Sequence, residues 1–119
     1  MSGAIRLLAG KTAAITGGTT GIGRAITLEY LRQGANVAVN HLGLPKDAPL
    51  LRSLHEVARR MRDDDAADVA PTGELLDLKG DVTDQNACDA LVSEAVGRWG
   101  QLDVFVANAG IVKATEFLE

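Results

Sequence analysis

The stretch that decides the fold reads KTAAITGGTTGIG over residues 11–23. Its first half is a short apolar, partly β-branched run, which predicts a buried strand over residues 11–16. The run ends abruptly in Gly17 and Gly18, and a helical pattern follows over residues 21–33. The sequence therefore predicts a strand, a glycine loop and a helix in direct succession.

Three further strands are expected, over residues 36–40, 74–79 and 102–107, because each is a short and largely apolar run. Helices are expected between them, one opening at Pro49 and one capped by Thr83 or Asp84. Alternating strands and helices predict a parallel sheet covered on both faces. We therefore expect an α/β, Rossmann-like, doubly wound fold that is incomplete, with about four strands and intervening helices.

Apolar residues at helical spacing indicate which face of each helix packs on the sheet. The expected faces are Ile22, Ala25, Ile26 and Tyr30 in the first helix, Leu50, Leu54, Val57, Ala58 and Met61 in the second, and Cys88, Leu91, Val92, Ala95, Val96 and Trp99 in the third. Cys88 is thereby expected to be a small core residue. Another helix is expected to begin at Thr115 or Glu116.

Composition limits the class of protein. The 119 residues carry a net charge of −4, with 46% hydrophobic and 3% aromatic residues, which fits one soluble domain over residues 1–119. No apolar run approaches the roughly 18 residues of a membrane span, and no signal peptide is recognisable, so we expect a cytoplasmic protein without a membrane partner. Mild acidity and few aromatics disfavour nucleic-acid binding. A single cysteine, Cys88, excludes an intrachain disulfide and leaves no zinc ligand set, so no metal site is expected.

The glycine loop predicts nucleotide binding. Gly17 can turn the chain off the strand, Gly21 lets backbone approach a pyrophosphate, and Gly23 lets the helix pack close to the sheet. The helix N-terminus offers N–H groups and partial positive charge to phosphates. Hydroxyl groups accompany the glycines at Thr16, Thr19 and Thr20. A strand-to-helix turn without a ligand is the plainer alternative.

Three short motifs follow the carboxyl ends of predicted strands. They are Thr16-Gly17-x-x-x-Gly21-Ile22-Gly23, Asp81-Val82 and Asn108-Ala109-Gly110. In this order they resemble the cofactor loop, the adenine-binding Asp-Val pair and the Asn-Asn-Ala-Gly motif of the short-chain dehydrogenase/reductase family. Ala107 stands where that family often has its first Asn. The resemblance covers essentially the whole chain.

The resemblance implies a bound nicotinamide dinucleotide. The pyrophosphate loop would consist of Gly17, Gly21, Ile22 and Gly23, with the hydroxyls of Thr19 and Thr20 beside them. Asp81 would bond the adenine amino group, and Val82 would approach the adenine ring through its backbone. Residues 108–110 would hold the fourth strand's end beside the cofactor riboses, through Asn108, Ala109 and Gly110. From the residues alone, Asp81 could equally begin a helix and residues 108–110 could form a turn.

The choice between NAD and NADP stays open. An acidic residue about 20 positions after the first glycine would bind the ribose 2′-OH and favour NAD, but residues 39–43 read VNHLG, without an acid, Lys or Arg. Thr20 occupies a position where NADP-preferring members of the family often have a basic residue. Asn40 can hydrogen-bond a free ribose hydroxyl, and a protonated His41 could approach a 2′-phosphate. A solvated loop residue is the alternative for His41.

No catalytic residue is assigned. The family resembled here uses a Ser and a Tyr-x-x-x-Lys pair that follow the Asn-Ala-Gly motif. Tyr30 is the only tyrosine, and Gly34 lies four places after it. The serines lie outside any such motif, at Ser2, Ser53 and Ser93. Residues 63–65, three aspartates, are interpreted as a solvated helix end, and His55 as a helix-surface or partly packed residue rather than a catalyst.

The leading interpretation is the N-terminal NAD(P)-binding half of a short-chain dehydrogenase/reductase, truncated before its catalytic segment. The parent enzyme would transfer a hydride between the nicotinamide and an alcohol or carbonyl substrate. Residues 39–42 and 108–119 look most like sugar dehydrogenases, including L-rhamnose and glucose 1-dehydrogenase types. The alternatives are a non-catalytic nucleotide-binding or interaction module and a nonfunctional remnant. The strand at 102–107 is expected to form an exposed apolar edge through which the chain self-associates.

Overall fold

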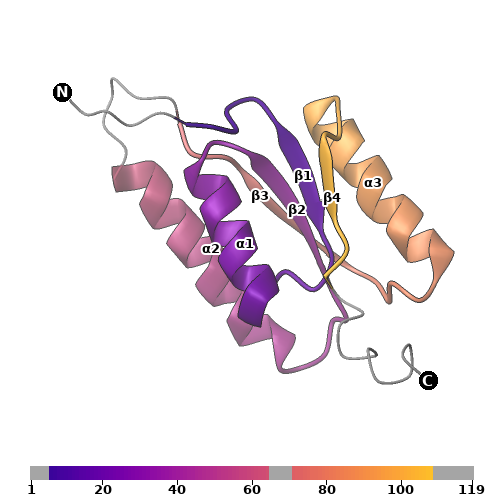
Figure 1. The fold of residues 1–119 in the computed structure, drawn as a ribbon. Helices are drawn as coiled ribbons and strands as arrows, with labels where there is room; N and C mark the ends of the chain where they lie inside the picture. Colours follow the sequence, from indigo (N-terminus) through magenta and orange to yellow (C-terminus); the bar gives the residue numbers. More distant parts are fainter. Residues whose placement is uncertain (1–5, 65–70, 109–119) are drawn as a thin grey trace.

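The computed structural model describes residues 6–64 and 71–108. Four parallel strands form one sheet in the order β3-β2-β1-β4: β1 (Thr12–Ile15), β2 (Asn36–His41), β3 (Leu75–Lys79) and β4 (Val104–Val106). The helices between them are α1 (Gly21–Arg32), α2 (Asp47–Asp64) and α3 (Gln85–Trp99). Helices α1 and α2 cover one face of the sheet and α3 covers the other (Figure 1). This arrangement confirms the expected four-stranded, Rossmann-like α/β fold.

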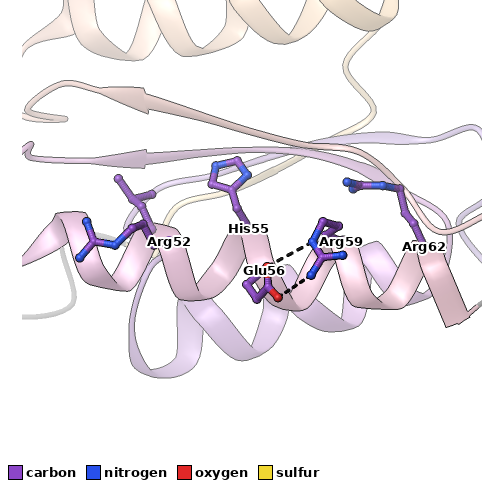
Figure 2. A pocket seen from close by; sticks show the side chains of 6 residues that line it. Arg52, His55, Glu56, Arg59 and Arg62 are labelled. Carbon is purple, nitrogen blue, oxygen red and sulfur yellow. Dashed lines mark hydrogen bonds and ion pairs between the residues drawn. The ribbon is translucent and has the colours of Figure 1, made fainter.

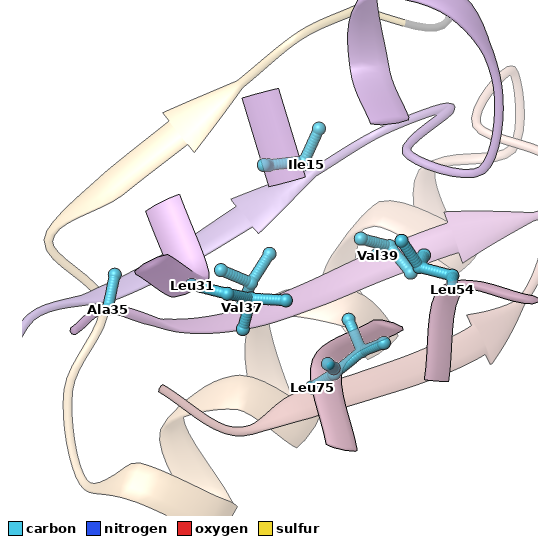
Figure 3. Close-up of a cluster of buried hydrophobic side chains, with 8 residues drawn as sticks. Ile15, Leu31, Ala35, Val37, Val39, Leu54 and Leu75 are labelled. Atoms are coloured by element: carbon cyan, nitrogen blue, oxygen red, sulfur yellow. The ribbon is translucent and has the colours of Figure 1, made fainter. Parts of the chain in front are cut away.

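The core consists of two apolar clusters, one on each face of the sheet. The larger lies under α1 and α2 (Figure 3) and contains Ile15, Leu31, Ala35, Val37, Val39, Leu54, Ala58 and Leu75. The smaller contains Ala14, Ala38, Leu91 and Ala95, under α3. Burying one aliphatic side chain stabilises a fold by about 1.5–3 kcal/mol. The near-continuous apolar runs of β1 and β2 follow from their central place, since both of their faces are covered.

The expected face of α2 is confirmed, whereas that of α1 is wrong in part. Ile22 is 65% exposed, and Ala25 is exposed as well. The buried residues are instead Gly23, Thr27 and Leu31, which lie four positions apart. Gly23 sits against the carbonyl of the preceding glycine loop, and this contact sets the rotation of the helix. The face of α1 that packs on the sheet is therefore the one that contains Gly23, Thr27 and Leu31.

The face of α3 is narrower than expected. Leu91 and Ala95 are buried, but Val96 is 40% exposed. Cys88 is half-buried rather than a core residue, and its Sγ donates to the Val82 carbonyl at 3.6 Å. The buried face of helix α3 therefore consists of Leu91 and Ala95.

Capping contacts fix the element ends that sequence patterns left uncertain. Helix α2 begins at Asp47, two residues before Pro49, because the Asp47 carboxylate accepts the Leu44 N–H at 2.8 Å. Asp84 caps α3 by accepting the Asn86 N–H at 2.9 Å. Strand β4 is shorter than expected since the side chain of Asp103, rather than backbone, accepts the Thr12 N–H.

Several expectations fall on residues outside the described ranges. They concern Ala109 and Gly110 of the third motif, Asp65 of the aspartate run, and the helix start at Thr115 or Glu116. In the described part of the chain, no helix combines the length and apolar character needed to cross a bilayer.

Candidate functional site

The candidate site lies where β1 and β4 end side by side. The chain continues from β1 to β2 on one side, while β4 pairs with β1 on the other, so the strand order reverses between β1 and β4. In open α/β sheets, ligands bind outside the carboxyl ends of the strands at such a reversal. Asn108 joins the two ends: its backbone N–H donates to Thr16 Oγ1 at 2.9 Å and its Nδ2 to the Gly17 carbonyl at 3.1 Å.

Each glycine singled out in the loop after β1 has a structural reason. Gly17 and Gly21 have φ angles of +66° and +55°, in the left-handed region that favours glycine. A Cβ on Gly23 would lie 2.1 Å from the Gly17 carbonyl oxygen, so only glycine allows this approach. A Cβ on Gly21 would meet no atom within 4 Å. The loop therefore packs tightly on its inner side and is open above Gly21.

The N-terminus of α1 borders this open space. Thr20 is the N-cap, yet its side chain makes no capping hydrogen bond, and the first turn has no acidic residue. Helix N-termini leave N–H groups without intrahelical partners and carry partial positive charge. Thr20 is exposed, whereas Thr19 is only 5% exposed. The end of α1 is therefore suited to receive an anionic group.

Thr27 supports the loop from below, and sequence reasoning missed it. Its Oγ1 is buried and donates to the Gly23 carbonyl at 2.8 Å and lies 3.4 Å from the Gly18 carbonyl. A threonine four residues after a loop glycine is a usable signal, because its hydroxyl can bond the carbonyl one turn earlier. Thr27 thus fixes the start of α1 against the loop.

Asn40 joins three strand ends. It is 5% exposed; its Oδ1 accepts the Gly17 N–H at 2.8 Å, and its Nδ2 donates to the Gly80 carbonyl at 2.7 Å. The side chain therefore connects the loops that follow β1 and β3 beneath the candidate site. Its expected contact with a ribose hydroxyl stays a prediction.

His41 takes part in a cluster with Asp77 and His55. Its Nε2 lies 3.1 Å from Asp77 Oδ2, and its Nδ1 accepts the Gly43 N–H at 3.0 Å. His55, from α2, places its Nε2 2.7 Å from Asp77 Oδ1. Burial raises the pKa of Asp77, but the hydrogen bonds from His55 and His41 outweigh it and hold the pKa below its ordinary value. The expected contact of His41 with a 2′-phosphate also stays a prediction.

The Asp81-Val82 pair follows β3 at the same edge of the sheet. Asp81 Oδ1 accepts the backbone N–H of Thr83 at 2.9 Å and its hydroxyl at 2.8 Å. Asp81 is exposed and Val82 is partly buried. These bonds orient the carboxylate, while the adenine contact of the pair stays a prediction.

A second candidate for a binding site is a hollow of about 530 Å³ on α2 (Figure 2). It is lined by Leu51, Arg52, His55, Glu56, Arg59 and Arg62. Arg59 bonds Glu56 at 2.6 Å and Asp63 at 2.8 Å, which raises the pKa of Arg59; the bond from Arg59 lowers the pKa of Glu56. Such pairs are ordinary on an exposed helix, so the carboxyl edge of the sheet is the stronger candidate.

The sheet order, the glycine loop and the helix that opens from it define a Rossmann-like α/β protein. The comparison with protein families agrees: a model described as short chain dehydrogenase matches residues 11–119. The chain belongs to the short-chain dehydrogenase family.

Similar proteins include several sugar and polyol dehydrogenases. The chain is 42% identical over 113 residues to L-rhamnose-1-dehydrogenase from Scheffersomyces stipitis, covering 95% of this chain and 40% of that protein. Identity is 38% with sorbitol dehydrogenase from Cereibacter sphaeroides, covering 94% of this chain and 37% of that protein. Identity is 35% with L-rhamnose 1-dehydrogenase (NAD(P)(+)) from a Sphingomonas species, covering 97% of this chain and 40% of that protein.

Solved structures of the family have the same fold. A short-chain dehydrogenase/reductase from Serratia marcescens superposes with a TM-score of 0.70 at 31% identity, covering 88% of this chain and 38% of that one. A short-chain type dehydrogenase/reductase from Mycobacterium marinum superposes with a TM-score of 0.69 at 30% identity, covering 90% of this chain and 38% of that one. The chain therefore spans about two fifths of the length of the relatives it matches.

Proposed function

We propose that this chain is the NAD(P)-binding part of a short-chain dehydrogenase/reductase. The observation that carries the proposal is the loop after β1, which is open above Gly21 and borders an α1 N-terminus without an acidic residue or a side-chain cap. A pyrophosphate has the charge and acceptor oxygens that such a helix end binds. The fit rests on this chain's own geometry and is independent of the relatives' names.

The same edge of the sheet supplies the remaining cofactor contacts in this proposal. Gly17, Gly21 and Gly23 shape the pyrophosphate loop, with Thr19, Thr20 and Ile22 beside them. Asp81 and Val82 receive the adenine, and Asn108 lies by the riboses. When bound, the nicotinamide supplies or accepts a hydride. The protein's part is to bind and orient that ring at the end of β4.

The proposed substrate of the parent enzyme is an alcohol or carbonyl compound, and a sugar or polyol in particular. Support comes from three relatives named L-rhamnose or sorbitol dehydrogenases. Hydride transfer to a carbonyl also needs a positioned proton donor. Tyr30 is the only tyrosine in the sequence and packs against the larger core cluster. We therefore propose that this chain supplies the cofactor side of the reaction, in the cytoplasm, and that another segment supplies the proton donor.

Fluorescence titration with NADH and with NADPH tests the proposal. We expect saturable binding of at least one cofactor and no turnover of rhamnose, sorbitol or simple alcohols by residues 1–119 alone. Gly21→Asp should weaken binding of both cofactors at least about tenfold, because it places a carboxylate at the open helix end.

Gly97→Asp is the matched control, since Gly97 is an exposed residue of α3 and an added Cβ there would have no atom within 4 Å. Circular dichroism spectra of both variants report whether the fold persists. Binding unaffected by Gly21→Asp, or no binding by the unmodified chain, would contradict the proposed site. Turnover by the chain alone would contradict the division between cofactor and proton donor. Binding with no activity in any longer protein that contains the chain would favour a nucleotide-binding module.

A further inference from the structure

Lys79 reaches the turn after β2 from the neighbouring strand. It is the last residue of β3 and pairs in register with His41, the last residue of β2. Its side chain lies over Gly43: a Cβ there would be 2.6–2.8 Å from Lys79 Cδ, Cε and Cγ. Gly43 has a φ of +76°. Because Gly43 has no side chain, the methylene groups of Lys79 can occupy the space above it.

The ammonium group of Lys79 is uncompensated at this turn. Lys79 is exposed, and within residues 6–64 and 71–108 it makes no ion pair or side-chain hydrogen bond. The nearest carboxylate along β3, Asp77, lies on the same face of the strand and is already bonded to His41 and His55. A cation without a partner therefore stands beside the end of β2.

His41 is less suited to an anion in the same place. Its Nδ1 accepts the Gly43 N–H, and its Nε2 faces Asp77. A hydrogen on Nδ1 would remove the acceptor of the first of these contacts. Both ring nitrogens of His41 are thus engaged within the protein, whereas Lys79, which lies over Gly43, makes no such contact in the described part of the chain.

We infer that Lys79 binds the 2′-phosphate of the adenosine ribose and gives the chain a preference for NADP over NAD. This inference rests on the proposed function. In Rossmann-like folds, the group that reads the ribose 2′ position stands at the end of the second strand. Here residues 39–43 contain no Lys, Arg, Asp or Glu, and the first lysine after β2 is Lys46, directly before α2. The parallel register instead brings Lys79 from β3 to the turn itself. A phosphate adds up to two negative charges at the position that Lys79 reaches.

Titration of NADPH and NADH against Lys79→Met and Lys79→Arg tests the inference. The unmodified chain should bind NADPH at least about tenfold more tightly than NADH. Lys79→Met should remove most of this preference by weakening NADPH alone, and Lys79→Arg should keep it. Added salt should weaken NADPH binding less in Lys79→Met than in the unmodified chain.

Lys11→Met is the matched control, because Lys11 is an exposed lysine directly before β1, at the opposite edge of the sheet. If the unmodified chain binds NADH as tightly as NADPH, the inference is overturned while the proposed function stands. Equal losses for both cofactors in Lys79→Met would also overturn it, since they indicate a structural role. Binding of neither cofactor by the unmodified chain would overturn the proposed function and, with it, this inference.

Discussion

Gly23→Ala should destabilise the chain although it adds a single methyl group. The added Cβ would lie 2.1 Å from the Gly17 carbonyl oxygen and 2.6 Å from Asn108 Nδ2, where real contacts stay above 3.0 Å. The first of these atoms belongs to the backbone and has no rotamer to adopt. Helix α1 must therefore move from the end of β1 by about 1 Å.

The cost has two parts. Overpacking of this kind costs about 1–3 kcal/mol. The displaced Asn108 side chain also loses its 3.1 Å hydrogen bond to Gly17, which is worth about 1 kcal/mol. Together they lower the free energy of unfolding by about 2–4 kcal/mol.

Urea unfolding followed by circular dichroism measures this loss, and Gly97→Ala provides the comparison. The same chemical change at Gly97, inside α3 and with open space around the added methyl, should stabilise the chain by about 0.5–1 kcal/mol. The two variants should therefore shift the unfolding midpoint in opposite directions. If Gly23→Ala unfolds at the same urea concentration as the unmodified chain, the close approach of α1 to β1 is wrong.

Three further outcomes are expected. Asn40→Ala should lower the free energy of unfolding by about 2 kcal/mol, because it leaves two backbone groups without their partner, whereas exposed Asn86→Ala should change it by less than about 0.5 kcal/mol; equal effects in urea unfolding would refute the bridging role. Asp77→Asn should cost about 1 kcal/mol at pH 7. Since the pKa of Asp77 is lowered from 3.8, its contribution is present above that pH and lost as the pH falls through the lowered pKa, so the difference in unfolding free energy between the two proteins should shrink at pH 3; a constant difference would count against the two histidine contacts. Phe105→Glu, on edge strand β4 where the ring is 42% exposed, should reduce self-association in sedimentation velocity; an unmodified chain that stays monomeric at every concentration would contradict this.

The architecture could be predicted from the sequence because short apolar runs alternate with helical patterns. Two glycines of the loop were predictable with their reasons, since Gly17 turns the chain with a positive φ and Gly23 packs against the Gly17 carbonyl. The approach of Gly21 to a pyrophosphate stays a prediction. Periodicity failed at Ile22, because apolar spacing does not report which row of α1 can approach the sheet. The need for a glycine at the closest contact decides that row.

Contacts between strands were beyond sequence reasoning. Asp77 and Lys79 lie beside His41 and Gly43 only because β2 and β3 pair in one particular register. A search confined to residues 39–43 therefore found no acid, Lys or Arg. Asn40 was recognised as a polar residue at the right place, yet its bonds depend on the loops that follow β1 and β3.

The position of β4 beside β1 affects the order in which the chain folds as it leaves the ribosome. β1, β2 and β3 can pair once residue 79 is free, but the contacts of Thr16 with Val106 join residues 90 positions apart. Until β4 is synthesised, one edge of β1 has no neighbouring strand. The nascent chain therefore exposes β1 to non-native pairing while α3 is being made. Protection by chaperones should matter most during that interval.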